Sequence, residues 1–300
     1  MSTPHPIHVD GHRLAALSLN PSAPGSPIIL IHGISASVNF WSAEQFPIFC
    51  KNGPTYLLSL PGHYPAVFPP ELPLSEISPE RIAHLLGTAI QHLVGDQPVT
   101  LVGHSTGGFA ALCIAAHKPE LVGRVASISG FAQGRWIGTL GLSQRLARSG
   151  TIGHLLFKLG YKAPRLNRSV FRVGWRSHLA DAQTLSTYKY FGALIDRFYP
   201  DYRQIDLEAM LKYFSVMPDI DISDQLCRIQ APTLALTGDR DPTVPPSQTH
   251  LIAQKVPKAE LAVIPGSGHF LFMENPQEYR RILSNWLRQE DGCWVAESGV

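Results

Sequence analysis

The sequence of 300 residues lacks most features of membrane-spanning, secreted or nucleic-acid-binding proteins. Charged residues make up only 16% of it, and 25 Lys and Arg residues against 23 Asp and Glu residues leave a net charge of +2. A chain this close to neutrality does not have the broad positive charge of a nucleic-acid binder, so we expect no nucleic-acid partner. No hydrophobic run approaches the roughly 18 residues that a membrane-spanning helix needs.

Cysteine is also scarce, and no CxxC pair is present. The four cysteines lie far apart in the chain, at Cys50, Cys113, Cys227 and Cys293. This spacing argues against both a zinc finger and a disulfide framework. No metal-ligand cluster and no dinucleotide-binding motif is visible, so the sequence predicts neither a metal nor a cofactor. The N-terminal stretch has no apolar core of a secretory signal, and we expect a cytoplasmic protein.

Hydrophobic residues, in contrast, make up 44% of the sequence, enough for a sizeable core. Six apolar runs of strand length end near Gly, Pro or Ser. They are Ile28–Ile31, Tyr56–Leu60, Val99–Val102, Val125–Ile128, Thr233–Leu236 and Leu261–Ile264. Continuous apolar runs of this length are typical of strands that are buried on both faces. Extended runs on either side of Asp10 and Gly11 predict a hairpin that precedes these six runs in the chain.

Segments with helical spacing separate these runs. One begins at Ser78, which can cap a helix whose first turn holds Pro79. Others cover Phe109–His117 and begin at Pro276. Strands that alternate with helices predict an α/β fold, with a mostly parallel central sheet flanked by helices.

The alternation stops between Ser129 and Thr233, where the sequence shows helical patterns and no convincing strand. A crossover between parallel strands needs only about a dozen residues. We therefore interpret residues 131–232 as a helical cap, inserted into a core formed by residues 1–130 and 233–300. The helical patterns of the cap are Leu140–Arg148, His154–Leu159, Asp181–Asp196 and Leu207–Phe214.

The strongest chemical signal follows the run Val99–Val102, where Gly103-His104-Ser105-Thr106-Gly107 forms a G-x-S-x-G pattern before a helix. A nucleophile elbow needs a sharp strand-to-helix turn that exposes one side chain. The flanking glycines permit such a turn, and the start of the helix offers free N–H groups. This context makes Ser105 the candidate nucleophile rather than one more serine in a surface turn.

A serine hydroxyl needs a base, and the base needs an orienting group. His269 follows the last apolar run and is the candidate base; we expect the neighbouring Gly266 and Gly268 to make its loop flexible. The acid should follow the run Thr233–Leu236, where two aspartates compete. Asp241 lies further out on the loop and is favoured. Asp239 remains the alternative, because its side chain can instead tie the loop together through backbone contacts.

Two other histidines lie close to these motifs. His104 precedes the candidate nucleophile, but we expect its side chain to point away from Ser105 and to be structural. His63, in the loop after Tyr56–Leu60, is a weaker candidate for the base than His269.

Four motifs together resemble the serine-nucleophile α/β-hydrolase superfamily. They are His32-Gly33, Gly103-His104-Ser105-Thr106-Gly107-Gly108, Gly238-Asp239-Arg240-Asp241-Pro242-Thr243-Val244-Pro245 and Gly268-His269-Phe270. The resemblance implies the α/β-hydrolase fold, with Ser105 as nucleophile, Asp241 as acid and His269 as base. The chain order of these three residues is the order that this superfamily uses. The resemblance also implies an oxyanion hole formed by the backbone N–H groups of Ile34 and Thr106.

The activity that the resemblance implies is cleavage of a carboxylic ester, of a small molecule or an acyl lipid, through an acyl-enzyme. Ser105 at the elbow separates this chain from haloalkane dehalogenases and epoxide hydrolases, relatives that use an aspartate there. Two alternatives remain open. One is a carbon–carbon bond hydrolase that acts on a dienoic keto acid, and the other is a ligand receptor that keeps the triad but turns over slowly.

Positive charge is concentrated in the cap. Residues 131–200 contain eleven Lys and Arg residues but only Asp181 and Asp196 as acids, a surplus of nine positive charges. Apolar residues are interleaved with them. Such a surface can contact an anionic membrane surface, steer an anionic substrate, or simply be solvated while its Arg stems cover apolar residues.

Overall fold

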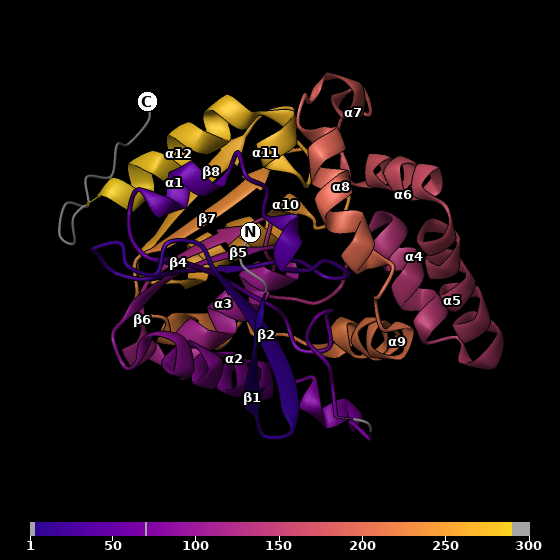
Figure 1. Ribbon diagram of the computed structural model, residues 1–300, viewed down its shortest axis with the longest axis horizontal. Helices are drawn as coiled ribbons and strands as arrows, with labels where there is room; N and C mark the ends of the chain where they lie inside the picture. The colour runs from indigo at the N-terminus through magenta and orange to yellow at the C-terminus, as the bar shows by residue number, and fades with distance from the viewer. Residues whose placement is uncertain (1–3, 70, 290–300) are drawn as a thin grey trace.

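The computed structural model describes residues 4–69 and 71–289, which form an α/β fold around an eight-stranded sheet (Figure 1). The strand order is β1-β2-β4-β3-β5-β6-β7-β8. Strands β3 to β8 run parallel, and the hairpin of β1 and β2 adds antiparallel strands at one edge. The predicted fold class is therefore confirmed. Cys293 lies outside the described residues.

All six predicted strands and the hairpin occur, with ends that differ by a few residues from the apolar runs. The strands are β1 (His5–Val9), β2 (His12–Ser18), β3 (Ile28–Ile31), β4 (Thr55–Leu58), β5 (Val99–His104), β6 (Val122–Ile128), β7 (Thr233–Gly238) and β8 (Ala259–Ile264). Asp10 and Gly11 form the hairpin turn with φ of 47° and 80°. Positive φ at both positions is what a tight hairpin turn requires, and it explains the Asp-Gly pair.

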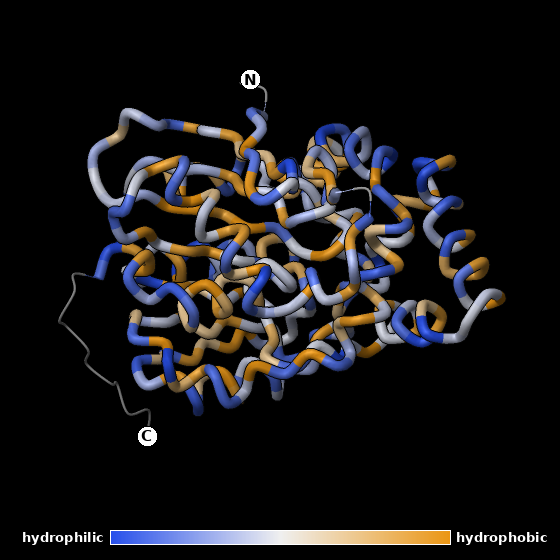
Figure 2. The backbone as a smooth tube through the Cα atoms, turned by 90° about the horizontal axis from the view of Figure 1, so that it is seen from below, coloured by the Kyte–Doolittle hydropathy of each residue, from blue (hydrophilic) through white to orange (hydrophobic). Residues whose placement is uncertain are grey.

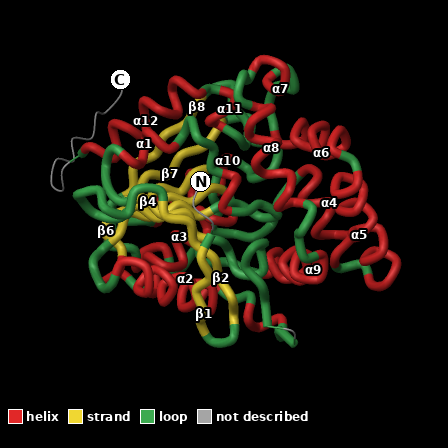
Figure 3. The backbone as a smooth tube through the Cα atoms, viewed as in Figure 1, coloured by secondary structure: helices red, strands yellow, loops and turns green. Residues whose placement is uncertain are grey.

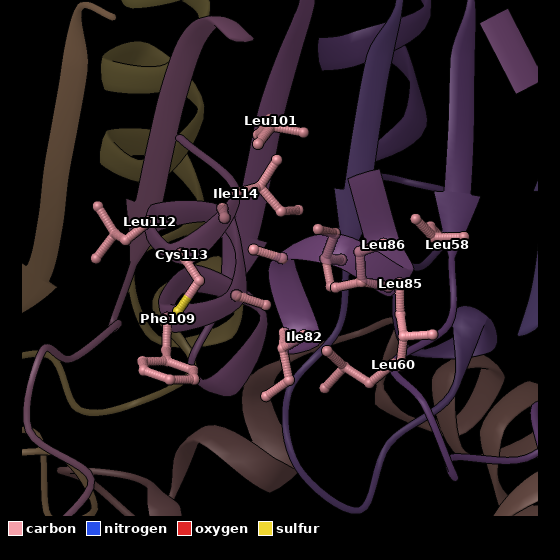
Figure 4. Close-up of a cluster of buried hydrophobic side chains, with 14 of the residues drawn as sticks. Leu58, Leu60, Ile82, Leu85, Leu86, Leu101, Phe109, Leu112, Cys113 and Ile114 are labelled. Carbon is pink, nitrogen blue, oxygen red and sulfur yellow. The ribbon is translucent and has the colours of Figure 1, made fainter. Parts of the chain in front are cut away.

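Helices cover both faces of the sheet (Figure 1). One face is covered by α2 (Pro79–Val94), α3 (Thr106–His117) and α10 (Pro246–Lys255), and the other by α1 (Phe46–Cys50), α11 (Leu271–Glu274) and α12 (Pro276–Arg288). Ser78 caps α2 as predicted, because its hydroxyl accepts a hydrogen bond from the N–H of Arg81 at 3.1 Å. Figure 4 shows the layer between sheet and helices, where Leu101 of β5 meets Ile114 of α3.

Between β6 and β7 the described chain forms helices and loops, without a strand (Figure 3). These helices are α4 (Gly138–Ala147), α5 (Gly150–Leu166), α6 (Arg168–Gly174), α7 (Thr184–Thr187), α8 (Phe191–Tyr202) and α9 (Leu207–Val216), with short 3₁₀ turns between some of them. They lie beside the sheet rather than over its faces (Figure 1). None of the helices in the described residues is both long and apolar enough to span a membrane.

Two details of the predicted cap helices are wrong. The pattern Asp181–Asp196 is not one helix, because the chain leaves helical geometry at Tyr188, where ψ is 101°. Tyr188 is buried there and its hydroxyl contacts Glu44, a partner 144 residues away. The second error is α6, which the patterns did not predict. It begins at Arg168 and is capped by Asn167, whose side chain accepts from the N–H groups of Ser169 and Val170.

Candidate active site

Ser105 occupies a strained turn between β5 and α3. Its φ of 55° and ψ of −119° lie outside the regions that residues with a side chain normally adopt. A Cβ atom at Gly103 would lie 2.1 Å from the carbonyl oxygen of Gly107, and one at Gly107 would lie 2.2 Å from that of Ile31. Only glycine fits at either position, which gives the G-x-S-x-G pattern a steric cause.

The candidate acid and base are in direct contact. Nδ1 of His269 lies 2.7 Å from Oδ2 of Asp241, and both side chains are buried. The other carboxylate oxygen of Asp241 accepts from the N–H groups of Thr243 at 2.8 Å and Val244 at 3.0 Å. These bonds fix the carboxylate, so it orients the imidazole with Nδ1 as the donor.

Asp239 has a different place. Its Oδ1 accepts from the N–H of Gly266 at 2.7 Å, at an exposed position on the surface. The bond joins the loop after β7 to the loop after β8. Asp239 thus holds two loops together, as the sequence analysis allowed. Asp241, and not Asp239, contacts the imidazole of His269.

Ser105, His269 and Ile34 line one cavity of about 340 Å³. The loop that carries Ile34 passes directly over the serine, since a Cβ atom at Gly33 would lie 3.1 Å from Cβ of Ser105. Among the described residues, no hydrogen bond joins Oγ of Ser105 to the ring of His269. In enzymes without substrate this bond is often long, and it shortens when substrate binds.

Of the two residues expected to supply the oxyanion donors, Thr106 directly follows Ser105 and Ile34 lines the same cavity. Thr106 is the first residue of α3, so its N–H has no partner within the helix. The Ile34 loop is held by His32, whose Nδ1 lies 2.8 Å from the carbonyl oxygen of Gly33 and whose Nε2 accepts from the N–H of Leu60 at 3.2 Å. Burial lowers the pKa of His32 to about 3, so the ring is neutral, as the acceptor role of Nε2 requires.

The cap contributes to this loop as well. Ser35 follows Ile34 with a φ of 57°, and its hydroxyl lies 2.7 Å from that of Tyr161 in α5. Tyr161 also lines the cavity. The position of the candidate oxyanion loop therefore depends on a side chain that comes from the cap.

His178 is a site residue that the sequence analysis missed. It lies in the cap turn Trp175–His178 and lines the cavity, and its carbonyl oxygen accepts from the N–H of His269 at 2.9 Å. Its Nδ1 lies 2.9 Å from the hydroxyl of Thr243, which follows Asp241. Burial, and then the nearby charge of His269, lowers the pKa of His178 to about 3. No local motif marks this histidine in the sequence.

His63 has structural surroundings, as expected, whereas the side chain of His104 does not point away from the site: its ring centroid lies 4.8 Å from that of His269. His104 lines the cavity, but its Nε2 lies 3.0 Å from the carbonyl oxygen of His269, so it supports the backbone of the candidate base. Nδ1 of His63 lies 3.0 Å from the carbonyl oxygen of Pro61, and its ring packs edge-on against Tyr213. His63 is not among the residues that line the cavity with Ser105.

Glu274 joins the His269 loop to the cap. One carboxylate oxygen accepts from the N–H of Gly268 at 2.8 Å and the other from the N–H of Ala180 at 2.6 Å. A Cβ atom at Gly268 would lie 2.5 Å from the Ala180 nitrogen. Glycine is needed at position 268 because the cap backbone approaches so closely, which is a different reason from the flexibility expected for this loop.

Glu274→Gln is expected to lower the free energy of unfolding by about 1–3 kcal/mol. The amide nitrogen of Gln would face the N–H of Gly268 or of Ala180, and one of these donors would lose its acceptor. Urea unfolding measures the change. Glu278→Gln is the matched control, because the carboxylate of Glu278 is partly exposed and, among the described residues, pairs only with Arg281 on the same helix. An equal loss of stability in both variants would contradict the role of Glu274.

Comparison with known proteins places this fold and these loops in a family. Residues 28–282 match the model of the alpha/beta hydrolase family. The chain belongs to this family. The resemblance predicted from the four sequence motifs is therefore confirmed, and it covers most of the chain.

Proteins with different activities resemble this chain. It is 28% identical to a pyrrolizixenacetamide deacetylase of Xenorhabdus hominickii, over 65% of this chain and 67% of that protein. It is 24% identical to a pimeloyl-[acyl-carrier protein] methyl ester esterase of Neisseria meningitidis, over 87% and 92%. The structure of 2-hydroxy-6-oxo-6-phenylhexa-2,4-dienoate hydrolase from Rhodococcus sp. strain RHA1 superposes with a TM-score of 0.70 at 19% identity, over 96% of this chain and 100% of that one. By their names these three proteins are a deacetylase, an esterase and a hydrolase, and the names do not agree on one substrate.

Proposed function

We propose that this protein is a serine hydrolase that cleaves a neutral, largely apolar carboxylic ester. The observation that carries the proposal is the 2.7 Å contact between Asp241 and His269, beside a cavity that Ser105 and Ile34 also line. Nucleophile, oriented base and backbone donors in one place are the parts that acyl transfer needs. The esterase and deacetylase among the similar proteins support the same class of reaction.

The reaction that this arrangement supports has two halves. Oγ of Ser105 attacks the ester carbonyl carbon while Nε2 of His269 takes the hydroxyl proton, and the N–H groups of Ile34 and Thr106 bind the negative oxygen. The ester C–O bond then breaks, and His269 returns the proton to the leaving alcohol. In the second half His269 takes a proton from water, whose oxygen attacks the acyl group. The acid leaves, and the proton returns to Ser105.

The lining of the cavity favours a neutral substrate over a dienoic keto acid. Within the described part of the chain, no Lys, Arg, Asp or Glu lines the cavity. Its wall is built largely from apolar side chains such as Leu140, Phe157, Phe171, Trp175 and Phe198. A carboxylate bound there would lose its hydration without gaining a cationic partner, which is costly. This argues against the carbon–carbon hydrolase alternative, despite the fold shared with the Rhodococcus enzyme.

The test is a fluorophosphonate label followed by peptide mapping and a substrate panel. We expect the label on the peptide that contains Ser105, turnover of neutral chromogenic esters, and no cleavage of a dienoic keto acid. Cleavage of the keto acid without turnover of any ester would contradict the proposal. Labelling of Ser105 with negligible turnover of every ester would instead favour the slow ligand receptor.

A further inference from the structure

Helices α5 and α6 expose large hydrophobic side chains that no other described segment covers. The two most exposed are Leu166, at 85%, and Ile152, at 74%. The remaining members of this group, which we call the apolar stripe, are Leu155, Leu156, Leu159, Val170 and Val173. Isolated exposed leucines are ordinary, but seven large hydrophobic residues within one helix pair are typical of an interaction surface.

The geometry of α5 sets the stripe apart from the core-facing side of the helix. Positions 152, 155, 156 and 159 repeat at three and four residues, so they lie along one side. Phe157 and Tyr161 are buried on the other side. A helix with one side in water needs only one apolar side, and α5 has two. Figure 1 places α5 at the edge of the molecule away from the sheet, and Figure 2 shows hydrophobic positions along this outer edge.

The same segment carries charge of one sign only. Residues 137–176 contain eight Lys and Arg residues and no Asp or Glu. Three of these cations pair with acids from residues 196–219, which offset part of the positive charge of the cap: Arg148 with Asp219, Lys158 with Glu208 and Arg168 with Asp196. The other five have no acidic partner among the described residues: Arg145, Lys162, Arg165, Arg172 and Arg176.

A small hollow at the C-terminal end of α5 brings cations and the stripe together. It is lined by Lys162, Arg165, Leu166 and Arg203. Nε of Arg165 donates to the carbonyl oxygen of Arg203 at 3.0 Å, which holds the two residues side by side. Three cations around one hollow suit an oxyanion, and the most exposed leucine of the stripe forms part of the same wall.

We propose that α5 and α6 dock on an anionic lipid surface. The apolar stripe would enter the boundary between headgroups and acyl chains, while Lys162, Arg165 and Arg203 contact headgroup phosphates. A surface with apolar side chains flanked by cations matches an anionic bilayer in both polarity and charge. A second copy of this chain matches it poorly, because pairing two such surfaces would bring like charges together.

The docking surface borders the cavity that contains Ser105. Leu156 belongs to the stripe and also lines the cavity, and Gly160 and Pro164 continue the cavity wall along α5. An ester that leaves the lipid phase at the stripe therefore meets an apolar path toward Ser105. Delivery of such an ester rests on the proposed function, whereas docking itself does not.

Co-sedimentation of the full-length protein with vesicles tests the docking. At low salt we expect recovery with phosphatidylcholine–phosphatidylglycerol vesicles to exceed that with phosphatidylcholine vesicles at least about tenfold, and to fall at high salt. The double variants Ile152→Ser/Leu166→Ser and Lys162→Glu/Arg203→Glu should each lose at least about tenfold in binding. Leu74→Ser is the matched control, because Leu74 is a half-exposed leucine outside the cap, and it should bind like the wild type.

Equal recovery with both kinds of vesicle, or full binding by Ile152→Ser/Leu166→Ser, would overturn the proposal. A different result would also overturn it. In this result, sedimentation equilibrium without lipid shows that the wild type is a dimer, the Ile152→Ser/Leu166→Ser variant is a monomer, and the wild type does not bind vesicles. Turnover of a short water-soluble ester is measured on the same samples. If the double variants keep the turnover of the wild type but lose vesicle binding, the docking proposal is supported. If the wild type binds vesicles but turns over no ester, only the proposed function is contradicted.

Discussion

Ser105→Ala is expected to lower kcat for ester hydrolysis by at least about 10⁴-fold, because it removes the only atom that can form the acyl-enzyme in the proposed reaction. The change should leave the fold intact. The hydroxyl of Ser105 makes no hydrogen bond among the described residues, and the bond from its N–H to the carbonyl oxygen of Ile128, at 2.8 Å, does not involve the side chain. Steady-state kinetics with a chromogenic ester measures the loss.

The matched control for this variant is Ser143→Ala. Ser143 lines the same cavity, but its hydroxyl donates to the carbonyl oxygen of Thr139 within α4 and lies on the cap rather than at the elbow. Its replacement should change kcat by less than about threefold. If Ser105→Ala retained activity within tenfold of the wild type, Ser105 would not be the nucleophile.

Asp241→Asn is expected to lower kcat by about 10⁴-fold, while Asp239→Asn changes it by less than about threefold. An amide nitrogen at Asp241 would face Nδ1 of His269 and favour the wrong tautomer of the ring. The amide oxygen of Asn can still accept from the N–H groups of Thr243 and Val244, so the loop should stay folded. Asn at position 239 likewise keeps its bond to the N–H of Gly266.

Comparing these two variants shows which aspartate orients His269 and which only holds the loop together. Both variants remove one carboxylate from the same loop, so a general effect of charge would lower kcat in both. Urea unfolding of each variant checks that the loop remains intact. Should Asp239→Asn show the larger loss, the assignment of the acid would be reversed.

The elements of the core could be predicted because their signals are local. The run at Val99–Val102 is apolar because β5 is buried on both faces, and the glycines at 103 and 107 follow from backbone atoms within about 3 Å of where their Cβ atoms would lie. A strand, a tight turn and a helix start are consecutive in the chain. One sequence window therefore contains the strand, the turn and the helix start that carry Ser105, although the carbonyl oxygen that excludes a side chain at Gly107 belongs to the distant Ile31.

The cap was harder to predict because contacts between distant residues set its helix ends. The break at Tyr188 depends on Glu44, and the position of the His269 loop depends on His178 and on the bond between Glu274 and Ala180. None of these partners lies within a few residues of the position it controls. The sequence analysis did not single out Glu274, although it follows His269 by only five residues, and this short spacing could have drawn attention to it.

The sequence by itself determined the fold class, the strand-to-helix turn at Ser105 and the positive charge of the cap, because each follows from residue types within a short window. The tertiary structure decided which aspartate meets His269, which cap cations pair with acids, and that the cavity has no charged wall in its described residues. The physical reason is the separation in sequence between the residues that interact. Hydrophobic periodicity and turn sterics act between near neighbours, whereas hydrogen bonds, ion pairs and cavity walls join residues that only the folded chain brings together.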